Sequence, residues 1–241
     1  MSRYFAYAEE TPETGVINVI TDWATKKKKT FLTLDCPSTY YVSLAFDPRD
    51  ETRYLAALSG PPKWMIIYWD FSSKPKMLAT IEVPGNFHLY SLSFHPKEES
   101  FMFVFGNATL KTFKYKSGTI ELKNTISAKT MKDFASVSQN FLSHSWLNDG
   151  QLMVGNDRGD LLQVNGQNVS NYEFRRVLGR SPGEGFPIEV MIPYSKGFIV
   201  GGPDATVIIY DKHEGDINNP YIPVEKKIQV YFFELCVSDS D

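Results

Sequence analysis

YVSLAFDPRDETRYLAALSGPPKWMIIYWDFSSKPKMLATIEV, residues 41–83, is the stretch that decides the fold. It holds four short runs, at 41–46, 54–59, 64–71 and 76–83, that are rich in β-branched, aromatic and leucine side chains. Such residues favour strands, whereas Gly, Pro, Asp and Ser favour turns. The breakers that close the first three runs are Asp47-Pro48, Gly60-Pro61-Pro62 and Ser72-Ser73. This pattern predicts one antiparallel four-stranded sheet.

The same unit then recurs along the chain. The corner formed by Phe46 and Pro48 returns at Phe94 and Pro96, a shift of 48 residues. A glycine is expected in the turn after each second strand, and successive intervals of 46, 49 and 46 residues separate Gly60, Gly106, Gly155 and Gly201. Self-similarity at this period, with four strands in each repeat, predicts the blades of a β-propeller rather than a helical solenoid.

The ends of the third strands support this interpretation. WD repeats end this strand with a Trp-Asp pair, and the chain has Trp69-Asp70 in one repeat and Tyr210-Asp211 in another. We therefore expect these two pairs and the four glycines to be structural repeat positions.

The remaining chain extends the array in both directions. We expect an all-β, WD40-type β-propeller at 1–230 with a tail at 231–241, in which about four full blades accompany a partial one. The partial blade covers 3–34 and has no predicted first strand. The full blades cover about 41–83, 89–126, 139–178 and 186–230. Since propellers usually close into a ring of four to eight blades, we expect an incomplete ring or a fragment of a larger propeller.

Three local features accompany these blades. The lysine run at 26–29 is expected in a loop between strands, and 127–138 is a polar insertion in which a short helix is only weakly signalled. In the last blade we place the fourth strand at 224–230, after a long polar loop at 213–223.

Composition restricts the classes of protein and partner. The chain has 241 residues, 42% hydrophobic residues and a formal charge of −3, so it can bury a large core and gives no global reason to expect nucleic acid or an acidic membrane as a partner. Two cysteines, Cys36 and Cys236, cannot build a disulfide framework. With no signal peptide and no apolar stretch long enough to span a bilayer, we expect a soluble protein in a reducing, intracellular compartment.

The sequence predicts no catalytic, cofactor-binding or metal-binding residues. None of the four histidines, His88, His95, His144 and His213, has a neighbouring ligand at a recognised metal spacing. No nucleophile elbow, P-loop or dinucleotide fingerprint is present. The densest basic groups are candidates for contact with an acidic partner, although plain solvated edges explain them better: Lys26, Lys27, Lys28, Lys29, Arg175, Arg176 and Arg180.

Four stretches resemble the N-terminal propeller of cilia- and flagella-associated WD-repeat proteins: VSLAF at 42–46, GPPKW at 60–64, LSHSWL at 142–147 and YSKGFIVGG at 194–202. The resemblance covers about residues 3–210. It implies a structural component of the motile axoneme, in a family with tandem propellers followed by coiled coil. The implied partners are axonemal: inner-arm dynein, tubulin, or neighbouring docking and regulatory proteins on doublet microtubules. Compared with that family, we expect the opening blade, the remaining blades and a heptad region to be missing from residues 1–241.

We therefore expect a non-catalytic interaction scaffold of the ciliary axoneme. A general WD-repeat adaptor in trafficking or ubiquitin ligation is the alternative, since the fold alone permits it equally. A propeller hydrolase is disfavoured, because the starts of the first strands near Tyr41, Leu89, Phe141 and Ile188 supply no acid, histidine or metal ligand.

Overall fold

A computed structural model describes residues 4–22, 24–25, 27–32, 38–126, 140–165, 173–178, 185–203, 206–213, 215, 221–224 and 228–229. Every regular element in this part is a strand, and all strand pairings are antiparallel. The all-β class predicted from the sequence is confirmed.

The first sheet has three strands in the order β1-β2-β3, namely Phe5–Glu10, Gly15–Asp22 and Lys27–Leu32. The second sheet is β4-β5-β6-β7, formed by Tyr41–Phe46, Tyr54–Ser59, Met65–Asp70 and Lys76–Glu82. The third sheet is β8-β9-β10-β11, formed by Leu89–Phe94, Phe101–Gly106, Thr109–Lys116 and Thr119–Ile126.

The fourth sheet is β12-β13-β14-β15, formed by Phe141–Trp146, Leu152–Asn156, Leu161–Asn165 and Glu173–Leu178. The fifth sheet is β16-β17-β18-β19, with the short β20 also paired to β18. Its strands are Val190–Tyr194, Gly197–Gly202, Thr206–Lys212, Tyr221–Pro223 and Ile228–Gln229.

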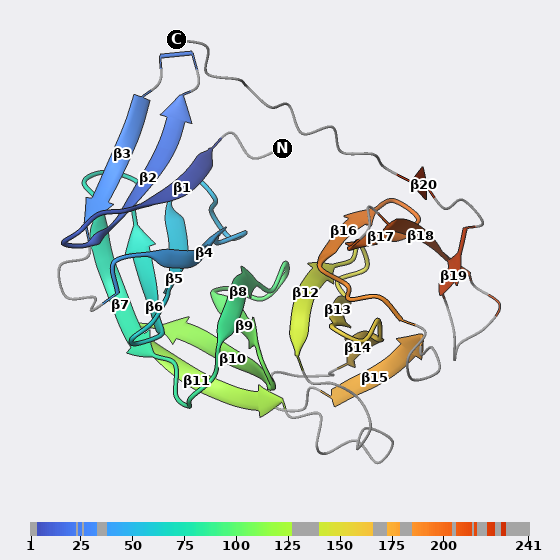
Figure 1. Cartoon of the computed structure of the whole chain (residues 1–241). Coiled ribbons are helices and arrows are strands. Elements are labelled where there is room, and N and C mark those ends of the chain that lie inside the picture. The colour runs from blue at the N-terminus through green and yellow to red at the C-terminus, as the bar shows by residue number, and fades with distance from the viewer. Residues whose placement is uncertain are drawn as a thin grey trace, which may run out of the picture.

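The five sheets stand around a central axis like the blades of an open ring (Figure 1). The first strand of each complete sheet lies innermost, so that β4 lies beside β8 and β12 beside β16. The first and fifth sheets face each other across an opening at the top of the view, and the ring is not closed (Figure 1).

The core lies between the sheets rather than within them. In β5, Leu55 and Ala57 join the cluster that packs on Ile17 and Val19 of the first sheet. The alternate residues Ala56 and Leu58 join the cluster on the third sheet, together with Leu92, Phe94, Met102 and Val104. This alternation follows from the two-residue period of a strand, and it explains why β5 and β9 are apolar at successive positions.

Side-chain hydrogen bonds join neighbouring inner strands at one repeated position. The third residue of each of three inner strands is a serine, and its hydroxyl bonds the next sheet. Ser43 Oγ accepts from Leu92 N at 3.1 Å, Ser91 Oγ lies 3.2 Å from His144 Nδ1, and Ser143 Oγ donates to Ile188 O at 2.7 Å. These bonds satisfy polar groups that the packing of sheets takes away from water.

The lysine run was predicted in the wrong element. Lys27, Lys28 and Lys29 lie in β3 rather than in a loop between strands. Lys29 Nζ donates to Phe71 O at 2.5 Å and to Ser72 O at 2.8 Å, both in the turn after β6. Since these carbonyls belong to the next sheet, sequence spacing within the first sheet could not reveal the partner.

The outer edge of the fifth sheet was also predicted incorrectly. The expected strand at 224–230 is replaced by two segments, β19 and β20, that pair with opposite ends of β18. Tyr221 was assigned to a projecting loop, but its side chain is fully buried and its ring packs edge-to-face on Phe198 at 5.0 Å. The insertion at 127–138 and the tail at 231–241 lie outside the described residues.

Replacing Trp69 with alanine is expected to destabilise the fold by about 3–5 kcal/mol, because truncating a buried aromatic side chain leaves a cavity. Trp69 is 5% exposed and packs in the cluster between the first and second sheets. Chemical denaturation measures the effect, and Leu122→Ala is the control because Leu122 is 40% exposed. Equal unfolding midpoints for the two variants would contradict the packing of Trp69.

Candidate interaction surface

The residues expected at the ends of the third strands occupy corresponding places. Asp70 is the last residue of β6, and Arg53 donates to it through Nε at 2.9 Å and Nη2 at 2.9 Å. Although burial opposes the shift, hydrogen bonds from Ser72 and Arg53 lower the pKa of Asp70. In β18, Tyr210 is buried and Asp211 accepts a hydrogen bond from the Tyr194 hydroxyl. Each aspartate thus ties the end of a third strand to a residue of a neighbouring strand or turn.

The four repeat glycines lie at neighbouring, not identical, positions. Gly60 follows β5, Gly106 ends β9, and Gly155 and Gly201 lie inside β13 and β17. None of them has positive φ, which among the described glycines occurs at Gly85, Gly118, Gly150 and Gly159. A Cβ would instead overlap Tyr40 at Gly60, His88 O at Gly106 and Ile188 at Gly155. Close approach of the segment that leads into a first strand is therefore the reason for glycine at these three positions.

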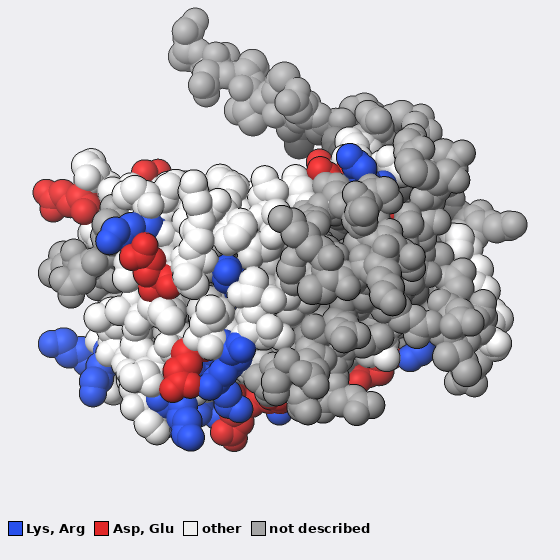
Figure 2. All heavy atoms as spheres, turned by 90° about the horizontal axis from the view of Figure 1, so that it is seen from below, with Lys and Arg blue, Asp and Glu red and all other residues white. Residues whose placement is uncertain are grey.

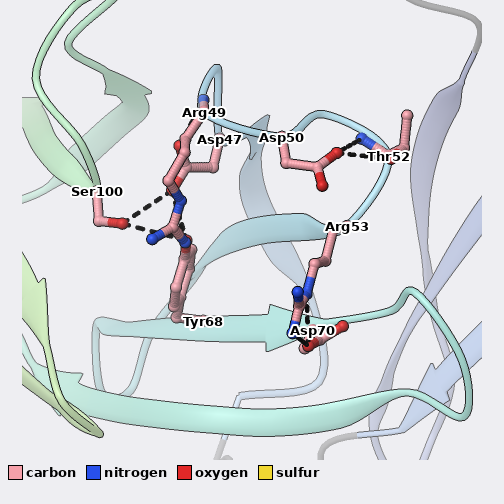
Figure 3. A network of polar contacts seen from close by, with 8 residues as sticks. All are labelled: Asp47, Arg49, Asp50, Thr52, Arg53, Tyr68, Asp70 and Ser100. Carbon is pink, nitrogen blue, oxygen red and sulfur yellow. Dashed lines mark hydrogen bonds and ion pairs between the residues drawn. The ribbon is translucent and has the colours of Figure 1, made fainter.

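A buried polar network joins the second and third sheets at the turns that follow the inner strands (Figure 3). Asp47 is fully buried, and its carboxylate accepts from the Tyr68 hydroxyl at 2.5 Å and from Ser100 Oγ at 3.1 Å. Arg49 donates to the Tyr68 oxygen at 3.2 Å. Burial, followed by the hydrogen bond to Asp47, raises the pKa of Tyr68, so the phenol stays protonated and remains a donor. We interpret the network as structural, because each of its side chains forms a hydrogen bond with another member of the network.

A groove of about 340 Å³ opens between the fourth and fifth sheets, at the end where β12 turns into β13 and β16 turns into β17. Polar residues from both sheets line it, together with Leu147 and Tyr221. The polar lining residues are Asn148, Asp149, Tyr194, Ser195, Lys196, Asp211 and Lys212. It is the candidate binding site of the described chain, since concave sites with convergent polar groups are where ligands bind.

Two charged groups of this groove are paired with each other. Lys212 Nζ lies 2.6 Å from Asp149 Oδ2, and Asn148 Nδ2 donates to Tyr194 O at 3.1 Å. Burial, with the nearby Asp149 carboxylate, raises the pKa of Tyr221 to about 12. The Tyr221 phenol therefore stays protonated at neutral pH, and its hydroxyl donates to Gln151 Oε1 at 3.5 Å.

The histidines lie apart, and two of them are structural. His144 lies in β12, stacked on Phe105 at 3.9 Å between ring centroids. Burial lowers its pKa to about 4, so the ring is neutral at pH 7. His95 Nδ1 accepts from the backbone N–H groups of Lys97 and Glu98 at 3.1 and 2.9 Å, which caps the turn after β8. Burial lowers the pKa of His95 as well.

Basic side chains are interspersed with acids on the outer surface. Lys63 pairs with Glu82 at 3.5 Å, and Lys123 pairs with Glu121. Figure 2 shows lysine and arginine beside aspartate and glutamate on the face seen from below. Lys27 and Lys28 are exposed, whereas Lys26 and Arg180 lie outside the described residues, as do the side chains of Arg175 and Arg176.

The described residues hold no group of three or more His, Cys, Asp or Glu side chains placed to bind a metal ion. They also include no helix long and apolar enough to cross a membrane. Sequence reasoning missed the groove and the serine row of the inner strands. The serines were detectable, because Ser43, Ser91 and Ser143 hold the same place in three aligned strands, whereas the groove depends on how two sheets meet.

Sheets of this kind, arranged radially with the first strand innermost, define a β-propeller. The β-propeller domain of Cps50 (Swd1) from Myceliophteria thermophila superimposes with a TM-score of 0.65 at 14% identity, covering 95% of this chain and 69% of that one. At such low identity the likeness concerns the fold alone, and it confirms the propeller class predicted from the sequence. No protein-family model matches the chain.

Within that class, the chain is similar to cilia- and flagella-associated protein 57. Protein 57 A of Tetrahymena thermophila is 35% identical over 207 residues, which is 84% of this chain. The Mus musculus protein 57 is 25% identical over 162 residues, or 66% of the chain. The resemblance seen in the sequence is confirmed, and the names of both relatives agree with a ciliary or flagellar location. The chain spans 16% and 12% of these relatives' own lengths.

Replacing Tyr68 with phenylalanine is expected to cost about 1–3 kcal/mol, because the buried Asp47 carboxylate loses a donor. Urea denaturation compares this variant with Tyr115→Phe, which removes a hydroxyl from the ring packed against Tyr68 at 4.7 Å. Within the described part, the Tyr115 hydroxyl makes no hydrogen bond, so its loss should be nearly neutral. If both variants unfolded alike, the network would contribute nothing.

Acidification is expected to destabilise the protein through His144. Because the folded pKa is about 4 and the unfolded value about 6.5, the unfolded state binds more protons as the pH falls below 6.5. The stability present above pH 6.5 should decline by up to about 2 kcal/mol by pH 5. Thermal midpoints at pH 7.5 and 5 should differ less in His144→Gln than in the native protein. His213→Gln, which changes an exposed histidine, should keep the full difference.

Proposed function

We propose that the protein is a non-catalytic interaction scaffold of the motile ciliary axoneme. The observation that carries the proposal is the 35% identity to a cilia- and flagella-associated protein over 84% of the chain. A rigid propeller that displays many loops suits such a role, because binding surfaces can vary on loops while the sheets hold them in place.

More specifically, we propose that the protein takes part in the docking or assembly of inner-arm dynein on doublet microtubules. The proposed partners are dynein, tubulin or neighbouring docking and regulatory proteins. The groove between the fourth and fifth sheets is the contact site that we assign to this role. Its paired charges, Lys212 with Asp149, and its exposed Lys196 favour a polar protein segment over an apolar ligand. The engagement of its carboxylates by Lys212 and Tyr194 supports a role without catalysis.

Cross-linking mass spectrometry on intact axonemes from the source organism tests the proposal. We expect cross-links from the chain to inner-arm dynein or tubulin, with the lysines that flank the groove among the linked residues. Lys196→Glu should weaken these links, whereas Lys76→Glu, on the outer strand β7, should leave them unchanged. Absence of the protein from axonemes would refute the ciliary role, and its presence without dynein or tubulin links would refute the dynein assignment.

A further inference from the structure

Lysines of the third and fifth sheets meet at the fourth-sheet turn that lines the groove. Lys97 lies in the turn after β8, and its Nζ donates to Asp149 O at 3.3 Å. Lys212 ends β18, and its Nζ lies 2.6 Å from Asp149 Oδ2. Lys196 lines the groove from the turn between β16 and β17. All three lysines are exposed to solvent, so their charges are available to a ligand that enters the groove.

The carboxylates that line the groove already have partners. Asp149 pairs with Lys212, and Asp211 accepts a hydrogen bond from a tyrosine hydroxyl of its own sheet. Within the described residues, by contrast, Lys97 and Lys196 form no ion pair. Three ammonium groups therefore stand against two carboxylates around the groove, and the charge in excess is positive.

The free donors of the groove lie on one turn. Ser195 precedes Lys196, and its hydroxyl makes no hydrogen bond within the part of the chain that the structure describes. Glu98 and Glu99 follow Lys97 in the sequence, but neither lines the groove or pairs with a lysine among the described residues. An ammonium group beside a free hydroxyl suits an anionic acceptor, because both groups can donate to the same carboxylate.

We propose that the groove binds an acidic, extended segment of a partner protein, with one carboxylate of the segment on Lys196 and Ser195. This inference rests on the proposed role of the groove as a contact site, and it names the chemistry of the partner. A basic segment is disfavoured, because it would have to displace Lys212 from Asp149 to reach that carboxylate.

The size of the groove suits a peptide segment. Ligand pockets in proteins span about 300–1,000 Å³. At about 340 Å³ the groove therefore admits a few side chains rather than a large ligand. Since Lys97 and Lys196 belong to different sheets, a segment with several carboxylates can engage both sheets, whereas a single small anion has fewer contacts. Exposed charges are screened by salt, so binding should weaken as the salt concentration rises.

The test uses the full chain and a defined probe. The probe is a fluorescein-labelled peptide in which glutamate alternates with serine, and its counterpart has glutamine in place of every glutamate. Fluorescence anisotropy gives the dissociation constant at low and at raised salt. Lys196→Gln removes the proposed contact, and Lys76→Gln removes the same charge from an exposed position on β7, remote in sequence from the groove. Matching thermal midpoints of the two free variants verify that each is folded.

We expect the native chain to bind the glutamate peptide and not the glutamine peptide. Lys196→Gln should bind about threefold or more weakly, because an exposed charge-assisted contact is lost. Lys76→Gln should bind like the native chain. The proposal is overturned if the native chain does not bind the glutamate peptide, if the glutamine peptide binds equally, or if both variants lose the same affinity. Binding of a phosphoserine peptide in place of the glutamate peptide would also overturn it.

The outcome is separable from that of the proposed function. If Lys196 cross-links to an axonemal protein while the glutamate peptide fails to bind, only the acidic character of the partner is refuted. If the peptide binds as expected while the protein is absent from axonemes, only the ciliary role is refuted.

Discussion

The second, third and fourth sheets are apolar on both faces, and the rest of the structure depends on covering them. A strand buried on both sides gains stability from each neighbour, at about 25 cal/mol for every Å² of apolar surface removed from water. In β9, with all six residues buried, this gain requires sheets on both sides. The radial arrangement is one solution that gives every inner sheet two neighbours. In an open array, the two end sheets each keep one face that is exposed to water.

Polar contacts then fix how the sheets meet, a task that apolar packing alone performs loosely. The hydrogen bonds of the serines in β4, β8 and β12 fix the position of each of these inner strands along its neighbour in the next sheet. The Asp47 network sets the turn of the second sheet against Ser100 of the third. A buried carboxylate without hydrogen-bond donors destabilises the folded state. A misplaced sheet would therefore lose its apolar packing and leave the Asp47 carboxylate without donors at the same time. This coupling gives a rigid frame on which exposed loops can serve as binding surfaces.

The strands between residues 41 and 126 were predictable because their determinants are local. Runs such as MIIYWD and FMFVF combine β-forming side chains with nearby turn residues, and the structure begins and ends the four strands of residues 41–83 within one residue of the predicted bounds. The errors arose where the determinant is distant. Lys29 lies in a strand and bonds carbonyls 42 and 43 residues away, while the pairing of β18 is divided between two short segments. The repeat glycines were found by spacing, but small register shifts place them at different points of their strands.

The candidate groove and the exposed apolar side of the fifth sheet follow from the same geometry in different ways. Inner strands pack closely where a serine and a glycine allow it, and the groove lies at the far end, where turns of the fourth and fifth sheets carry charges rather than a filled core. The outward side of the fifth sheet, which carries the exposed side chains of Val190 and Ile192, has no serine at the position of Ser143, since Val190 takes that position. Replacing a serine by valine removes a hydrogen bond and adds apolar surface. The fifth sheet therefore has one face packed on the fourth sheet and exposed aliphatic side chains on the other.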